Sequence, residues 1–175
     1  MKTVFFDVDT QIDFLYPAGA LYVPGAESIV PFIARLNHAA ETLISTVDAH
    51  SEDDPEFRLY PPHCVSGTLG QHKPAATLVG QIILEKQTLD CFACARLVPL
   101  LQSLNADRYV VYGVVTEICV KFAALGLLKT GRRVEIVTDA VKALDEKAAG
   151  KMLAEFQSAG GFLTRASNVS HRLST

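Results

Sequence analysis

The sequence predicts an α/β fold in which a parallel sheet is covered by helices on both faces. Two observations support this prediction: short apolar segments alternate with longer amphipathic segments along the 175 residues, and polar motifs recur just after the predicted strands. Such alternation is typical of parallel sheets, whose ligand crevice lies at the carboxyl ends of the strands. We find no internal repeat, low-complexity tract or linker, so we expect a single domain spanning residues 1–175.

Six short apolar segments are predicted strands, and four longer segments are predicted helices. Short runs of β-branched and aromatic residues favour strands, whereas apolar residues recurring every three or four positions favour helices. The predicted strands are Val4–Val8, Thr42–Val47, Gln81–Glu85, Tyr109–Val115, Val134–Thr138 and Phe162–Thr164. The predicted helices are Ala26–Ala40, Cys94–Leu104, Glu117–Lys129 and Asp145–Ala159, the last with Asp145 as its N-cap and Gly160-Gly161 at its end.

The composition is that of a compact globular protein. Hydrophobic residues make up 49% and charged residues 20% of the chain, and the net charge is −3. An acidic balance argues against nucleic acid or an anionic membrane as a partner, and no apolar run has the length of a membrane span. The first strand begins almost at the N-terminus, so we expect no signal peptide and a cytoplasmic protein whose four cysteines are reduced.

A cysteine lies where a buried strand gives way to a helix. The run Tyr109–Val115 suits a strand buried on both faces, and the next helix has Thr116 as a predicted N-cap and Gly131 after its end. Cys119 then lies in the first helical turn, where free N–H groups and the helix dipole lower the pKa of a thiol and favour the nucleophilic thiolate. The alternative is that Cys119 is a small core residue.

Acidic residues and a lysine follow two other predicted strands. Asp7, Asp9 and Gln11 alternate along the first strand and so can share a face near its end, followed by Asp13. A carboxylate there can take a proton from a neighbouring nucleophile, or it can simply cap the next turn and face water. Lys86 follows the third strand and can hold a thiolate and a carboxylate together by its charge, although most lysines are surface residues.

The irregular segment Asp48–Lys73 carries candidate metal ligands. It lacks a helical or strand period, and long irregular loops in compact domains are usually functional or disordered. Asp48, His50, Glu56 and His63 are ligand types that Zn²⁺, Fe²⁺ or Mn²⁺ prefer, and Asp48 and His50 project to one side of an extended chain. The alternative is a set of solvated loop histidines.

A Cys-x-x-Cys motif supports a different class of function. Cys91 and Cys94 precede a predicted helix, as the dithiol of a redox protein does. They can equally be two small residues at a helix start, and no second pair follows at a spacing that suits a four-cysteine metal site.

Taken together, the motifs resemble those of the isochorismatase-like cysteine hydrolases. The resemblance spans Asp9 to at least Asp139, and the segment Pro61-Pro62-His63-Cys64 with Asp48-x-His50 is similar to the nicotinamidase branch. The motifs, in chain order, are Asp9-x-Gln11-x-Asp13-Phe14, Asp48-x-His50, Pro61-Pro62-His63-Cys64-x-x-Gly67-Thr68, Lys86 and Gly113-x-x-Thr116-x-x-Cys119-Val120.

This resemblance implies a doubly wound, Rossmann-like sheet of six parallel strands and a catalytic triad of Cys119, Asp9 and Lys86. It also implies a cis peptide bond between Val114 and Val115, so that the N–H groups of Val115 and Cys119 form an oxyanion hole. The activity implied is hydrolysis of the C–N bond of a small amide through a thioester, most specifically of nicotinamide to nicotinate and ammonia.

The same resemblance implies a divalent metal, zinc, iron or manganese, and no organic cofactor. Its ligands would be Asp48, His50 and His63, with Glu56 in place of a histidine usual in nicotinamidases, and Phe14 and Tyr60 would wall the substrate pocket. Lys86 is followed by Gln87-Thr88-Leu89-Asp90 instead of the glycine common in that branch. The alternative is a related hydrolase of another small amide, carbamoyl or ureido compound that uses no metal. Members of the family often self-associate, so a homo-oligomer is compatible with the resemblance.

Overall fold

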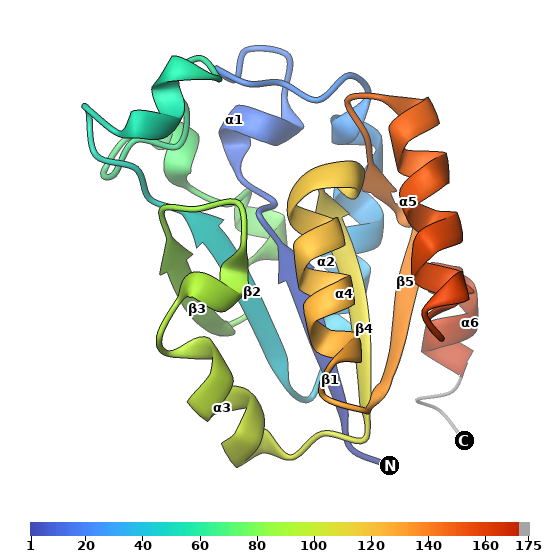
Figure 1. Ribbon diagram of the computed structural model, residues 1–175. Helices are drawn as coiled ribbons and strands as arrows, with labels where there is room; N and C mark the ends of the chain where they lie inside the picture. Colours follow the sequence, from blue (N-terminus) through green and yellow to red (C-terminus); the bar gives the residue numbers. More distant parts are fainter. Residues whose placement is uncertain (172–175) are drawn as a thin grey trace.

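A six-stranded parallel sheet forms the centre of the computed structural model, which describes residues 1–171 (Figure 1). The strand order is β3-β2-β1-β4-β5-β6, so the chain winds outward from β1 in one direction and then from β4 in the other. This confirms the predicted doubly wound sheet. The strands are β1 (Thr3–Val8), β2 (Leu43–Asp48), β3 (Ile82–Lys86), β4 (Arg108–Val114), β5 (Arg133–Lys142) and β6 (Phe162–Thr164).

Helices cover both faces of the sheet. Helices α4 (Lys121–Leu128) and α5 (Glu146–Ser158) pack together on the face toward the viewer in Figure 1, and α2 (Val30–Ala39) and α6 (Ala166–His171) pack on the opposite face. Helix α3 (Leu97–Leu104) lies beside the β3 edge, and the short helix α1 (Ile12–Leu15) follows β1. The central strands β1, β2 and β4 are almost entirely buried, which explains their continuous apolar sequences.

The predicted elements match the structure closely, with a few differences. The predicted helix over 26–40 begins as a 3₁₀ turn (Ala26–Ile29), and the helix predicted from Cys94 begins only at Leu97, after a 3₁₀ turn at Cys91–Ala93. Strand β5 runs four residues further than predicted, past the shift of its register with β4. Helices α1 and α6 were not expected from the sequence, because four to six residues are too few to establish a helical period.

Asp145 caps α5 as predicted, because its carboxylate accepts hydrogen bonds from the backbone N–H groups of Lys147 and Ala148. Among the described residues, no helix is long and apolar enough to cross a membrane.

The sheet brings the ends of four strands to one edge. In the parallel register, Asp48 at the end of β2 pairs with Lys86 at the end of β3, and Val8 of β1 pairs with Gly113 of β4. The residues that follow these strands therefore meet above the carboxyl edge, where open α/β sheets bind ligands.

Candidate active site

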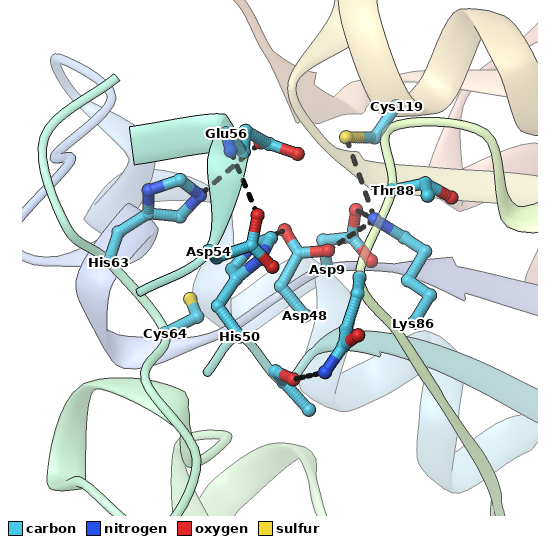
Figure 2. A network of polar contacts seen from close by, with 12 residues as sticks. Asp9, Asp48, His50, Asp54, Glu56, His63, Cys64, Lys86, Thr88 and Cys119 are labelled. Atoms are coloured by element: carbon cyan, nitrogen blue, oxygen red, sulfur yellow. Dashed lines mark hydrogen bonds and ion pairs between the residues drawn. The ribbon is translucent and has the colours of Figure 1, made fainter. Parts of the chain in front are cut away.

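Asp9, Lys86 and Cys119 meet at this edge. The Nζ atom of Lys86 lies 2.8 Å from Oδ2 of Asp9 and 3.9 Å from Sγ of Cys119 (Figure 2). The other oxygen of Asp9 accepts a hydrogen bond of 2.7 Å from the Thr46 hydroxyl. All three side chains are buried, so their charges interact in a medium of low polarity.

Cys119 lies in a π-helical turn, Thr116–Val120, between β4 and α4. The N-cap of this turn is Val115, whose side chain makes no capping hydrogen bond. The prediction that Thr116 is the N-cap is therefore wrong. Wider π turns often occur at functional sites inside helical segments. Here the turn places the thiol against Lys86.

The expected lowering of the Cys119 thiol pKa is also wrong. Burial raises the pKa of Cys119 well above its ordinary value; the Lys86 ammonium opposes this shift, and the Asp9 and Asp48 carboxylates reinforce it. Burial lowers the pKa of Lys86, but the negative groups Asp9, Cys119 and Asp48 outweigh it and hold that pKa well above the ordinary value. The resting site therefore pairs a neutral thiol with a charged lysine, and the thiol needs a base to become a nucleophile.

The peptide bond between Val114 and Val115 is cis, the conformation expected from the sequence resemblance. Val114, Val115 and Cys119 all line one cavity above the carboxyl edge of the sheet. The cavity also contains Phe14 and Tyr60, the two aromatic residues expected in the substrate pocket. Its remaining wall is formed by Leu21, Asp48, Glu56, His63, Leu89, Ile118 and Leu144.

Three predicted metal ligands gather beside this triad. One possible donor atom from each of Asp48, His50 and His63 lies within 4.8 Å of the others, and all three residues are buried. Nδ1 of His50 lies 3.0 Å from Oδ2 of Asp54, and Nδ1 of His63 lies 2.7 Å from the carbonyl oxygen of Pro61. Metal-binding histidines are usually oriented in this way, with the second ring nitrogen donating to a carboxylate or a carbonyl.

A buried ring nitrogen in this cluster has no partner. Nε2 of His50 makes no hydrogen bond to any described residue, although it lies 3.9 Å from Oδ2 of Asp48. Burying a polar atom without a partner is costly, and a metal would satisfy it. Burial also lowers the pKa of His63, which favours the neutral imidazole that binds metals. The donor set thus fits a divalent metal.

Glu56 and Phe57 border the cluster. Oε1 of Glu56 lies 3.7 Å from Nε2 of His63, and the Phe57 ring packs against both imidazoles at centroid distances of 5.4 and 5.7 Å. Both belong to a 3₁₀ turn, Pro55–Arg58, which Asp54 caps by accepting from the Glu56 N–H. Sequence reasoning did not place Asp54 or Phe57 at the site, although an Asp before a Pro is itself a signal for such a turn.

Asp7, Cys91 and Cys94, which the sequence also offered as candidates, lie outside this cluster. Asp7 belongs to a separate buried network on β1, where its carboxylate pairs with Lys73 at 2.8 Å, so it does not share a site with Asp9. The prediction that Asp7 and Asp9 share a face assumed a regular strand, and the positive φ of Asp9, 50°, interrupts that regular alternation. Cys91 is buried in the 3₁₀ turn before α3, Cys94 directly follows this turn and is partly buried, and all four cysteines are free thiols.

The chain is similar to proteins of one family. The model of the isochorismatase domain matches residues 3–167. A nicotinamidase of Acinetobacter baylyi (strain ATCC 33305 / BD413 / ADP1) is 28% identical over 172 residues, which cover 79% of this chain and 80% of the relative.

Two solved structures have the same fold. The pyrazinamidase of Pyrococcus horikoshii in complex with zinc has 29% identity and a TM-score of 0.86, covering 94% of this chain and 99% of that one. PnC1 from L. infantum in complex with nicotinate has 30% identity and a TM-score of 0.86, covering 95% and 93%.

Proposed function

This chain belongs to the isochorismatase family, and we propose that it hydrolyses the carboxamide of nicotinamide or a close analogue with Cys119 as the nucleophile. The observation that carries this proposal is a single cavity lined by Cys119 and by three of the candidate metal ligands, Asp48, Glu56 and His63. A planar ring held near the metal ligands would place its amide beside the thiol. The similarity to a nicotinamidase and to a structure that contains nicotinate supports the substrate.

The first half of the reaction forms a thioester. Asp9 takes the proton of the Cys119 thiol, while the Lys86 ammonium stabilises the thiolate. The sulfur attacks the amide carbon, and the N–H groups of Val115 and Cys119 are the proposed donors to the oxyanion. The C–N bond then breaks, and the leaving nitrogen takes the proton from Asp9 and departs as ammonia.

The second half returns the enzyme to its starting state. Asp9 removes a proton from a water molecule, and the resulting hydroxide attacks the thioester carbon. The C–S bond breaks, and the proton on Asp9 returns to the Cys119 sulfur. The acid formed from the hydroxide gives its proton to solvent and leaves as nicotinate. The raised pKa of the thiol is consistent with this sequence, because Cys119 then loses its proton only when Asp9 and the substrate are both in place.

We propose that Asp48, His50 and His63 hold a divalent metal, with Glu56 as a further ligand. When bound, the metal would supply a Lewis-acidic position for the ring nitrogen of the substrate. Two ligand atoms that are each about 2.1 Å from one ion lie no more than about 4.2 Å apart, and the 3.7 Å between Glu56 and His63 satisfies this limit. The similarity to a pyrazinamidase structure that contains zinc supports the site.

Ammonia release from nicotinamide tests the activity. We expect wild-type protein to release ammonia and nicotinate, Cys119→Ala to release neither, and Cys94→Ala, whose thiol lies outside the cavity, to behave as wild type. Full activity in Cys119→Ala would refute the proposed chemistry. Loss of activity in Cys94→Ala and retention in Cys119→Ala would support a redox function of the Cys91 and Cys94 pair instead.

Metal analysis separates nicotinamide from the alternative substrates. A bound zinc, iron or manganese in purified protein supports the nicotinamidase-like proposal. Metal-free protein that cleaves carbamoyl or ureido compounds with Cys119, and not nicotinamide, would favour the related hydrolase.

A further inference from the structure

Gln11 lies beside the proposed catalytic groups but is not one of them. Its side-chain amide forms two hydrogen bonds with the backbone of Asp48: Nε2 donates to the Asp48 carbonyl at 2.7 Å, and Oε1 accepts from the Asp48 N–H at 2.7 Å. Nε2 also donates to the carbonyl of Gln71 at 2.8 Å. Gln11 is fully buried, so these hydrogen bonds do not compete with solvent. The Asp48 backbone is therefore fixed to the segment that follows β1.

Asp13, two residues later, fixes the segment that carries His63. Its Oδ2 accepts from the N–H of Cys64 at 2.7 Å, and its Oδ1 accepts from the N–H of Ala20 at 3.0 Å. Cys64 follows His63 directly and has a left-handed φ of 46°, a backbone conformation uncommon for a residue other than glycine. The Cys64 carbonyl in turn accepts from the N–H of His50 at 3.1 Å. One peptide segment thus links Asp13 to both histidines.

The surrounding backbone leaves room for the Asp13 carboxylate only because residue 70 is a glycine. A Cβ atom at Gly70 would lie 2.1 Å from Oδ2 of Asp13, the same oxygen that accepts from Cys64. Gly70 does not have a positive φ, so an alanine there would be excluded by the carboxylate and not by its backbone conformation.

We propose that Gln11 and Asp13 are positioning residues that hold the metal ligands Asp48 and His63 at fixed positions relative to Asp9. This inference rests on the proposed function, because it assigns a role toward the proposed metal. The two residues act differently. Gln11 holds Asp48, which contacts Lys86 as well as the metal cluster, so Gln11 affects both the metal and the nucleophile. Asp13 holds the backbone beside His63 and affects only the metal.

The test compares Gln11→Met and Asp13→Asn with wild type in two assays. Zn²⁺ affinity is measured by competition with a chelator, and the rate of Cys119 alkylation by iodoacetamide is measured on metal-free protein with mass mapping of the modified thiol. Asp53→Asn, an exposed position in the same loop, is the control. Denaturant unfolding of each variant shows that it is folded.

We expect both variants to lose about tenfold or more in Zn²⁺ affinity, as is typical when a residue that orients a ligand is changed. Methionine at position 11 cannot hydrogen-bond to the backbone of Asp48. Asparagine at position 13 turns its own N–H group toward one of the two backbone N–H groups from which Asp13 accepts hydrogen bonds. Alkylation of Cys119 should slow at least threefold in Gln11→Met, because Lys86 loses its fixed partner, and remain unchanged in Asp13→Asn. If Gln11 and Asp13 only stabilised the fold, the rate of Cys119 alkylation would change in both variants in proportion to their loss of free energy of unfolding.

A double-substitution cycle isolates Asp13 from general damage. Gly70→Ala should weaken Zn²⁺ binding in the wild-type background and have no further effect in Asp13→Ala, where the new methyl group meets no carboxylate. Equal effects of Gly70→Ala in both backgrounds would overturn the role of Asp13.

Zn²⁺ affinity within twofold of wild type in both folded variants would overturn the inference. Failure of the proposed function gives a different result. If wild-type protein binds no divalent metal, the proposed metal site is refuted together with the role of Asp13, while the alkylation rates still decide whether Gln11 acts through Asp48 on Lys86.

Discussion

Lys86 contacts Asp48 as closely as it contacts Asp9: its Nζ atom lies 2.5 Å from Oδ1 of Asp48 and 2.8 Å from Oδ2 of Asp9. Oδ2 of Asp48 is turned toward His50. One carboxylate therefore contacts the proposed catalytic lysine with one oxygen and the proposed metal site with the other. Burial, and next the charge of Asp9, raise the pKa of Asp48 to about 7, whereas the contact with Lys86 opposes this rise and favours the charged carboxylate. A bound metal would favour the charged form too.

Asp9→Asn tests the general base. The amide keeps the size of the side chain and an acceptor for Thr46, but it cannot take the thiol proton. We expect kcat for nicotinamide to fall by about 10²- to 10⁴-fold. Bound metal, measured by elemental analysis, should remain at the wild-type level, since Asp9 is not among the ligands. Normal kcat in this variant would exclude Asp9 as the base.

Lys86→Met removes the charge between two buried carboxylates. Taking one partner from a buried ion pair typically destabilises a protein by about 3–5 kcal/mol, because the other charge stays buried. We expect a loss of this size in the free energy of unfolding from urea titration at pH 8, together with loss of activity. The loss should shrink at pH 5, where Asp48, whose pKa is about 7, is protonated and needs no partner. A loss that does not depend on pH would contradict this explanation.

Glu56→Gln tests the additional metal ligand. The amide preserves the shape of the side chain, but as a neutral ligand it binds a divalent ion more weakly than a carboxylate does. We expect metal affinity, measured by chelator competition, to fall by about 10- to 100-fold. His50→Ala removes a ligand with no replacement and serves as the reference for near-complete loss. Unchanged affinity in Glu56→Gln would limit the ligand set to Asp48, His50 and His63.

The buried thiols make the fold sensitive to alkaline pH. Burial raises the pKa of Cys91 from its ordinary value of 9.0 to about 12, and burial raises the pKa of Cys64 and Cys119 as well. Above pH 9 the unfolded chain releases these protons while the folded chain retains them, so the free energy of unfolding falls as pH rises.

Each thiol contributes about 1.4 kcal/mol per pH unit to that fall over the range between its two pKa values. Urea titrations between pH 9 and 12 should give Cys91→Ala a shallower slope than wild type by this amount. An identical slope in the variant would show that Cys91 does not titrate in this way.

Gly113 is required by a close approach between β4 and β1. Its φ is 120°, and a Cβ atom at this position would lie 2.1 Å from the carbonyl oxygen of Val8. We expect Gly113→Ala to lose about 3 kcal/mol or more, from both backbone strain and displacement of the strand. The matched control is Gly150→Ala in α5, where a Cβ meets nothing within 4 Å and should stabilise the helix by up to about 1 kcal/mol. Thermal unfolding of both variants compares the two effects.

Local sequence patterns predicted much of the fold. Strands with continuous apolar residues, such as Tyr109–Val115, are typical of a parallel sheet buried on both faces, and Asp145 before an amphipathic run marks a helix start. The same patterns placed Asp9, Asp48 and Lys86 at strand ends. Since parallel strands end at one edge of their sheet, these residues had to lie near one another.

Local sequence patterns thus specify the sheet, the edge at which the site lies and the residues available there. How those residues act on one another depends on the packing of distant segments. The neutral state of the Cys119 thiol depends on burial and on the balance of Lys86 against two carboxylates, none of which is a local property. The contact of Asp48 with Lys86 joins segments 38 residues apart, and the hydrogen bonds of Gln11 with the Asp48 backbone join segments 37 residues apart. Distances between such segments are set by packing, and electrostatic interactions follow those distances.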